Sequence, residues 1–190
     1  MDSEFMNQIS ELLALRGVHV LRFEFPYMAQ RRQDGRKRPP NPQKQLLTCW
    51  REIYQAVRSY TSPELPLFIG GKSMGGRMAS MVADELQVTG LVCLGYPFYA
   101  PGKPEKPRIA HLQPLLTPTL IVQGDRDALG ARPFVESCEL SKRIRLQWLP
   151  EGDHDFKPRK SSGLTQYDLL LAAAEGVANF LRETVSIAGE

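Results

Sequence analysis

The sequence is poor in the side chains that hold metals, disulfides and membrane spans. Only three cysteines and three histidines occur among its 190 residues. Cys49, Cys93 and Cys138 share no metal-like spacing, and an odd number of cysteines in an intracellular-looking chain is typical of free thiols. No apolar run approaches the roughly 20 residues of a membrane-spanning helix. The sequence therefore predicts no disulfide framework, no metal or cofactor, and no membrane span.

An excess of one charge is also lacking. The net charge is +3, which is too small to indicate nucleic acid by itself. The basic stretch RRQDGRKR (31–38) has no aromatic residue for base stacking, so we interpret it as a solvated loop, with binding of an acidic partner or nucleic acid as the alternative. The start, MDSEFMNQIS, has no basic or apolar signal region. We expect a cytoplasmic protein, and the sequence leaves its oligomeric state open.

Segments with the apolar spacing of helices and of strands alternate along the chain. Three of the expected strands are apolar on both faces, which is typical of a parallel sheet covered by helices. The sequence therefore predicts one α/β domain over residues 1–190. The expected strands are 18–25, 66–71, 90–96, 119–124 and 143–149. The expected helices run from residue 5 to Gly17 after a cap at Asp2 or Ser3, then over 46–60, 74–86, 133–140 and 164–184, with loops at 26–43 and 97–117.

The stretch IGGKSMGG (69–76) fits two different motifs. Its Gly-Lys-Ser could end a phosphate-binding loop, but that loop requires a glycine five residues before Gly71. Pro66 occupies this position, and the residues between are typical of a strand. The same stretch is also G-x-S-x-G, the turn that presents a nucleophilic serine between a buried strand and a helix. Because both neighbours are predicted, we interpret Ser73 as the candidate nucleophile.

Glycines surround this serine for a steric reason. A serine in a strained backbone conformation needs neighbours with almost no side chain. Gly71 lies two residues before Ser73, and Gly75 lies two residues after it. Gly76 is expected to let the following helix approach the strand. Lys72 is interpreted as a surface residue near the helix start.

A serine needs a base, and the chain offers three histidines. His19 starts an expected strand and His111 lies in a proline-rich loop. His154 follows the last expected strand, at the carboxyl edge of the sheet, where open α/β folds place their chemistry. His154 is therefore the preferred candidate.

An acid that orients the histidine should follow another strand. The stretch GDRDALG (124–130) comes directly after the strand at 119–124 and offers Asp125 and Asp127. Either one could instead be a turn residue or a helix cap. With either acid, the chain order is nucleophile, acid, base, which is the order of the α/β-hydrolases.

Over essentially its whole length, the chain resembles α/β-hydrolases of the dienelactone-hydrolase-like type. More narrowly, it resembles small hydrolases with a G-G-K-S-M-G-G-R turn and a strand that ends in Phe-Pro-Tyr, here residues 25–27. The resemblance implies a mostly parallel sheet in a three-layer α/β/α arrangement. It selects Asp127, three residues after Gly124, and places His154 in its G-D-H-x-F stretch. It also implies that the backbone N–H of Met74 is an oxyanion donor.

One departure from the family pattern concerns the N-terminal strands. The family has a strand and an H-G-x-G-like loop before its first helix, and this loop supplies a second oxyanion amide. This sequence starts at or just before that helix. We therefore expect about 15–25 further residues upstream, with a strand that would lie between the expected strands 18–25 and 66–71, because unpaired backbone within a sheet is costly. The alternative is a genuine truncation at Met1 with impaired catalysis.

Two functions follow from these observations. The first is a serine hydrolase for small esters, thioesters or related acyl compounds, with Tyr27, Phe98 and Tyr99 as candidate pocket residues. The second is a non-catalytic relative that keeps the fold for binding and has an incomplete oxyanion hole. The expected partner is a small acyl substrate rather than nucleic acid or membrane.

Overall fold

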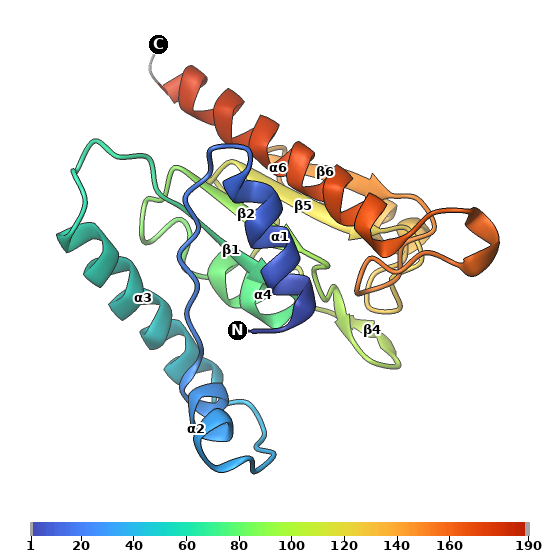
Figure 1. The fold of residues 1–190 in the computed structure, drawn as a ribbon, viewed down its shortest axis with the longest axis horizontal. Helices are drawn as coiled ribbons and strands as arrows, with labels where there is room; N and C mark the ends of the chain where they lie inside the picture. Colours follow the sequence, from blue (N-terminus) through green and yellow to red (C-terminus); the bar gives the residue numbers. More distant parts are fainter. Residues whose placement is uncertain (1, 189–190) are drawn as a thin grey trace.

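A four-stranded parallel sheet forms the centre of the computed structural model, which describes residues 2–188 (Figure 1). The strands lie in the order β1-β2-β5-β6, and all three neighbouring pairs are parallel. The sheet confirms the predicted α/β fold class. Its strands are β1 (Phe68–Lys72), β2 (Gly90–Leu94), β5 (Thr119–Gly124) and β6 (Ile144–Leu149).

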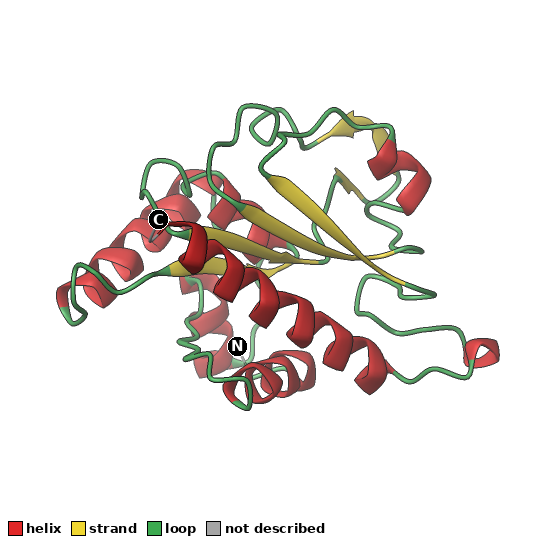
Figure 2. Ribbon diagram, turned by 90° about the horizontal axis from the view of Figure 1, so that it is seen from above, coloured by secondary structure: helices red, strands yellow, loops and turns green. Residues whose placement is uncertain are grey.

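Helices cover both faces of this sheet, so the molecule has three layers (Figure 2). On one face, α1 (Glu4–Ala14) packs against α6 (Gln166–Ala188). The Ser3 hydroxyl accepts a hydrogen bond from the Met6 N–H and so caps α1. The opposite face carries α3 (Gln43–Ser59), α4 (Met74–Ser80) and α5 (Arg132–Glu136), and a 3₁₀ turn at Lys160–Ser162 precedes α6.

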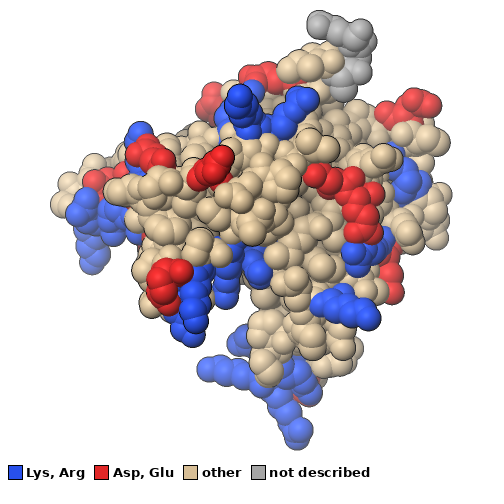
Figure 3. Space-filling model, turned by 180° about the vertical axis from the view of Figure 1, so that it is seen from behind, with Lys and Arg blue, Asp and Glu red and all other residues tan. Residues whose placement is uncertain are grey.

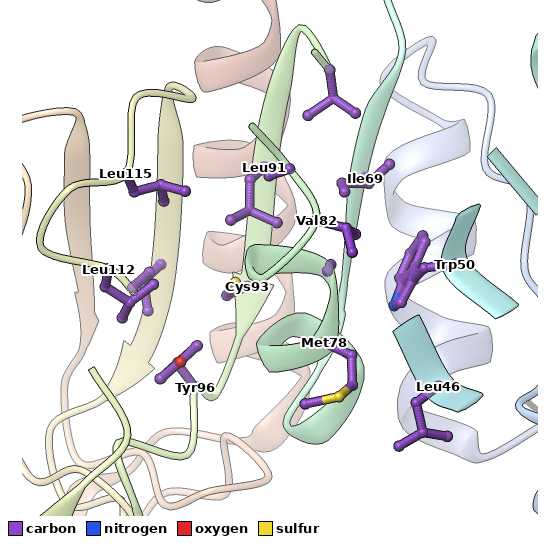
Figure 4. Close-up of a cluster of buried hydrophobic side chains, with 14 of the residues drawn as sticks. Leu46, Trp50, Ile69, Met78, Val82, Leu91, Cys93, Tyr96, Leu112 and Leu115 are labelled. Atoms are coloured by element: carbon purple, nitrogen blue, oxygen red, sulfur yellow. The ribbon is translucent and has the colours of Figure 1, made fainter. Parts of the chain in front are cut away.

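The buried strands send alternate side chains into two apolar clusters, because successive residues of a strand point to opposite faces. From β2, Leu91 and Cys93 enter the cluster that also holds Trp50 of α3 (Figure 4). From β5, Leu120 and Val122 enter the other cluster, with α1 and α6. Strands that are apolar on both faces are thereby buried on both faces, which fixes the plane of the sheet and the position of its carboxyl edge.

The predicted strand at residues 18–25 is wrong. This segment runs extended from α1 to α2 but forms no ladder with any strand. Phe23 instead packs edge-on against Trp50, with ring centroids 4.7 Å apart, and Phe25 is buried in the same cluster. The apolar side chains of this segment pack on the core, but a strand also requires a partner for its backbone groups.

The predicted loops at 26–43 and 97–117 both contain regular structure. Residues Pro26–Asp34 form α2, with proline in the first turn and Gly35 at the left-handed position that ends the helix. In the second loop, β3 (Tyr99–Ala100) and β4 (Lys103–Pro107) form an antiparallel hairpin. Its prolines are tolerated because β4 is exposed and pairs on one side only.

Two predicted helices are shorter than expected. After Ser80 the chain continues in turns, with hydrogen bonds between residues three apart, such as that from the Val82 N–H to the Ala79 carbonyl. Val82 and Ala83 are nevertheless fully buried, so the apolar pattern was correct and only the hydrogen-bond type differs. The helix expected to end at residue 140 ends at Glu136. No helix within residues 2–188 is long and apolar enough to cross a membrane.

Candidate active site

Ser73 lies at the turn between β1 and α4, at the carboxyl edge of the sheet. Its φ of 52° and ψ of −118° are strained for a residue with a side chain. Two backbone hydrogen bonds hold this conformation: the Ser73 N–H donates to the Leu94 carbonyl at 2.9 Å, and the Arg77 N–H donates to the Ser73 carbonyl at 3.0 Å. Strand pairing and helix formation together therefore fix the direction of the hydroxyl.

The glycines around Ser73 are not equally constrained. A Cβ on Gly71 would lie 3.1 Å from backbone atoms of Gly75 and Gly76, and a Cβ on Gly76 would lie 2.6 Å from the Gly71 carbonyl oxygen. A Cβ on Gly75 would meet nothing within 4 Å. The steric prediction is therefore corrected for Gly75: the close contact between helix and strand falls on Gly71 and Gly76.

His154 and Asp127 complete a hydrogen-bonded chain with Ser73. His154 Nε2 lies 2.9 Å from Ser73 Oγ, and His154 Nδ1 lies 2.8 Å from Asp127 Oδ2. Asp127 is fully buried, whereas the His154 side chain is 26% exposed. The three side chains come from the turns that follow β1, β5 and β6. The structure thus brings together the nucleophile, acid and base candidates in the expected order.

A buried glutamine that sequence reasoning missed holds the Asp127 carboxylate. Gln123 donates its amide N–H to Asp127 Oδ2 at 2.8 Å, and its amide oxygen accepts the Tyr96 N–H at 2.8 Å. The Leu129 N–H donates to the other carboxylate oxygen at 2.8 Å. The available signal was a single polar residue in the apolar strand TLIVQG. Gln123 has 0% exposure and orients the acid from inside the core.

The other acid and histidine candidates lie apart from this chain of contacts. Asp125 does not touch the imidazole, and its Oδ1 is buried without a hydrogen-bond partner. His111 Nε2 lies 2.9 Å from Ser80 Oγ and 3.2 Å from the Tyr96 hydroxyl. Burial lowers the pKa of His111 to about 4, so its ring is neutral at pH 7. His19 is exposed in the extended segment after α1.

Comparison with known proteins identifies the family of this chain. Residues 1–182 match the sequence profile of the family described as "Alpha/beta hydrolase domain". The chain belongs to this alpha/beta hydrolase family.

Solved structures of similar fold include several hydrolases at low sequence identity. Est1E from Butyrivibrio proteoclasticus, solved with ferulic acid bound, aligns with a TM-score of 0.71 and 16% identity, over 97% of this chain and 84% of that one. An alpha-beta serine hydrolase homologue from Coxiella burnetii aligns with a TM-score of 0.68 and 17% identity, over 94% of this chain and 76% of that one. The esterase domain of a Rhodothermus marinus protein aligns with a TM-score of 0.66 and 16% identity, over 96% of this chain and 82% of that one. At these identities the likeness shows the fold alone.

The candidate pocket residues of this hydrolase differ in their surroundings. Phe98 is fully buried, with its ring centroid 4.9 Å from that of Tyr96. It therefore packs in the core, which corrects its expected place on a pocket wall. Tyr99 packs edge-on against Phe134 at 4.7 Å. Tyr27 is partly buried, which raises the pKa of its phenol. For Tyr27 and Tyr99 the pocket role stays a prediction.

The basic stretch 31–38 of the hydrolase lies in α2 and just after it. Lys and Arg side chains gather at this end of the molecule in the space-filling view (Figure 3). Two ion pairs neutralise part of the charge: Arg32 lies 3.0 Å from Glu24, and Arg38 lies 2.5 Å from Asp34. The interpretation as a solvated surface stays a prediction. Within the described residues, no group of three metal-ligating side chains occurs.

Proposed function

We propose that this hydrolase cleaves small esters, thioesters or related acyl compounds through a covalent intermediate on Ser73. The observation that carries the proposal is the chain of two short contacts from Ser73 Oγ through the His154 ring to Asp127. These contacts occur at a strained turn at the carboxyl edge of a parallel sheet. Such a turn, with a base and a buried acid, is the arrangement that activates a serine hydroxyl.

The contacts support specific roles in proton transfer. A carboxylate beside His154 Nδ1 favours the tautomer with its proton on Nδ1, which leaves Nε2 free to accept a proton. Ser73 Oγ then attacks the substrate carbonyl carbon while its proton passes to Nε2. When the tetrahedral intermediate collapses, the bond to the leaving group breaks and Nε2 returns the proton to that group. The acyl group remains esterified to Ser73.

The acyl-enzyme is hydrolysed by the same two proton transfers, with water as the nucleophile and Ser73 Oγ as the leaving group. Nε2 takes a proton from the water that attacks the acyl-enzyme, and the collapse of the second intermediate returns that proton to Ser73 Oγ. Each intermediate carries a negative oxygen. Met74 is the first residue of α4, and the first N–H groups of a helix have no intrahelical acceptor. We assign the Met74 N–H as a donor to this oxygen.

The test uses a fluorophosphonate probe, which reacts with an activated serine, together with hydrolysis of nitrophenyl esters of increasing acyl length. Ser73→Ala should abolish both labelling and hydrolysis while the far-ultraviolet circular dichroism stays unchanged. Ser80→Ala is the matched control, because the Ser80 hydroxyl also contacts a histidine. Unlike Ser73, Ser80 is buried in a helix and does not have a positive φ. The folded fraction of this variant should still be labelled.

Absence of both labelling and hydrolysis in the parent protein would favour the alternative of a non-catalytic binding protein. A parent protein that neither reacts with the probe nor hydrolyses any ester would refute the proposed function. Equal labelling of the parent and Ser73→Ala would refute the assignment of the nucleophile.

A further inference from the structure

Lys72 occupies an unusual position for a lysine, directly before Ser73 at the end of β1. Its side chain is only 16% exposed, although the sequence suggested a surface residue. Because neighbouring residues of a strand point to opposite faces, this side chain leaves toward the α1 face, where its ammonium lies 5.4 Å from the ring centroid of Phe5. The residue therefore lies behind the nucleophile, between β1 and α1.

The ammonium of Lys72 binds the loop that carries the candidate base. Lys72 Nζ donates to the His154 carbonyl oxygen at 2.6 Å and lies 3.3 Å from Asp155 Oδ1. Among the described residues, no other hydrogen bond reaches that carbonyl oxygen. Lys72 thus links the backbone of His154 to the strand that ends directly before Ser73.

Neighbouring residues on two sides shape the path of the Lys72 side chain. A Cβ on Gly95 would lie 3.3 Å from Lys72 Nζ and 3.0 Å from the His154 carbonyl oxygen, and Gly95 has a φ of +62°. Because Gly95 has no Cβ, the Lys72 ammonium can pass beside it to reach the His154 carbonyl oxygen. On the other side, Phe5 also packs against the fully buried Phe156 at 5.3 Å. The N-terminal turn of α1 and the histidine loop therefore flank the Lys72 head group on two sides.

Placing an ammonium here has an electrostatic cost. Burial lowers the pKa of Lys72, and the carboxylates of Asp155, Asp127 and Asp153 oppose that shift. A methionine of similar length would fill the same space without this cost. The geometry therefore indicates that the hydrogen bond and the charge of this residue have a use beyond packing.

We propose that Lys72 is a positioning residue of the hydrolase, which holds the His154 backbone at the distance from Ser73 that proton transfer requires. The inference rests on the proposed function. Lys72 acts through His154, since its contacts lie on the α1 face and with the backbone of the loop. Small displacements of a base reduce the rate of chemistry more than they reduce substrate binding. Loss of this tie should therefore appear in kcat rather than in KM.

The experiment compares Lys72→Met with Lys157→Met. Both lysines, with Asp155, line one surface depression of about 250 Å³, so both variants lose one positive charge at nearly the same place. The Lys157 side chain is exposed and has no hydrogen bond or ion pair within the described residues. Active sites are titrated with the fluorophosphonate probe, and kcat and KM are then measured per titrated site on a nitrophenyl ester, alongside the Tm.

We expect Lys72→Met to lower kcat per titrated site by about 10- to 100-fold, with KM close to that of the parent, and Lys157→Met to match the parent. A purely structural role would instead lower the Tm and the titrated fraction, with kcat per site unchanged, and would overturn the proposal. An increased KM with parental kcat would also overturn it. If Lys72→Met does not fold, Lys72→Gln, whose shorter amide cannot reach the His154 carbonyl, must meet the same criteria.

Failure of this inference is distinguishable from failure of the proposed function. If the parent is labelled and Ser73→Ala is not, parental kcat in Lys72→Met refutes only the role of Lys72. If the parent itself is neither labelled nor active, the proposed function falls, and the role of Lys72 falls with it.

Discussion

Substituting the two adjacent glycines at the start of α4 should have opposite effects on stability. A Cβ on Gly76 would lie 2.6 Å from the Gly71 carbonyl oxygen and 3.2 Å from the Cys93 side chain, whereas ordinary contacts are 3.4–4 Å. The same addition at Gly75 meets nothing within 4 Å. Both positions are helical. The pair therefore separates helix propensity from the close approach of α4 to β1.

The magnitudes follow from these two contributions. Replacing a helical glycine by alanine typically stabilises by about 0.5–1 kcal/mol, because alanine loses less backbone entropy. Overpacking in a tight site typically costs about 1–3 kcal/mol. Because the 2.6 Å approach is to a backbone oxygen, the cost lies in the upper part of this range, about 2–3 kcal/mol. Gly76→Ala should therefore lower the free energy of unfolding by about 1–2.5 kcal/mol, or the Tm by roughly 2–10 °C in a protein of this size. Gly75→Ala should leave the Tm unchanged or raise it by up to about 4 °C.

Thermal unfolding followed by circular dichroism measures both variants directly. Urea unfolding of the same samples checks that the two changes are equilibrium effects. The reasoning would be refuted if Gly75→Ala lost as much stability as Gly76→Ala, since the clash would then not depend on the approach to β1. Activity is the poorer readout, because a side chain at Gly75 enters open space near Ser73.

Two further predictions concern the acid and the second histidine. Asp127→Asn should lower kcat by on the order of 10³- to 10⁴-fold, because an amide cannot stabilise the His154 cation in the required tautomer. Asp125→Asn should stay close to the parent, and a larger loss in that variant would reverse the assignment of the acid. Burial lowers the pKa of His111 in the folded protein from the ordinary 6.5 to about 4, so between these pH values only the unfolded chain binds this proton. Stability should therefore fall by about 2 kcal/mol as the pH drops from 6.5 to 4, and urea unfolding of His111→Gln should lack this part of the fall.

The correct parts of the sequence prediction rest on local patterns. Strands that are apolar on both faces must be buried on both faces, so 90–96 and 119–124 could be placed in a covered parallel sheet before any contact was known. The strand-turn-helix context of Ser73 could be predicted because the buried strand before it and the helix after it both have clear local patterns.

The errors arose where the structure of a segment depends on which distant residues it contacts. Residues 18–25 have the composition of a strand but pack on Trp50, and Pro26–Asp34 form a helix that the proline-rich context concealed.

The sequence by itself determined the order along the chain of the four strands of the parallel sheet, the strand-turn-helix context of Ser73, and two acid candidates. The family resemblance selected Asp127, and the tertiary structure places this residue rather than Asp125 on the imidazole. Only the tertiary structure decided that Gly76 rather than Gly75 is the tight position and that Lys72 faces inward. The physical reason is the range of the forces involved. Periodicity and turn chemistry act over a few residues, whereas each of these three choices depends on atoms that approach across the carboxyl edge of the sheet or between a helix and a strand.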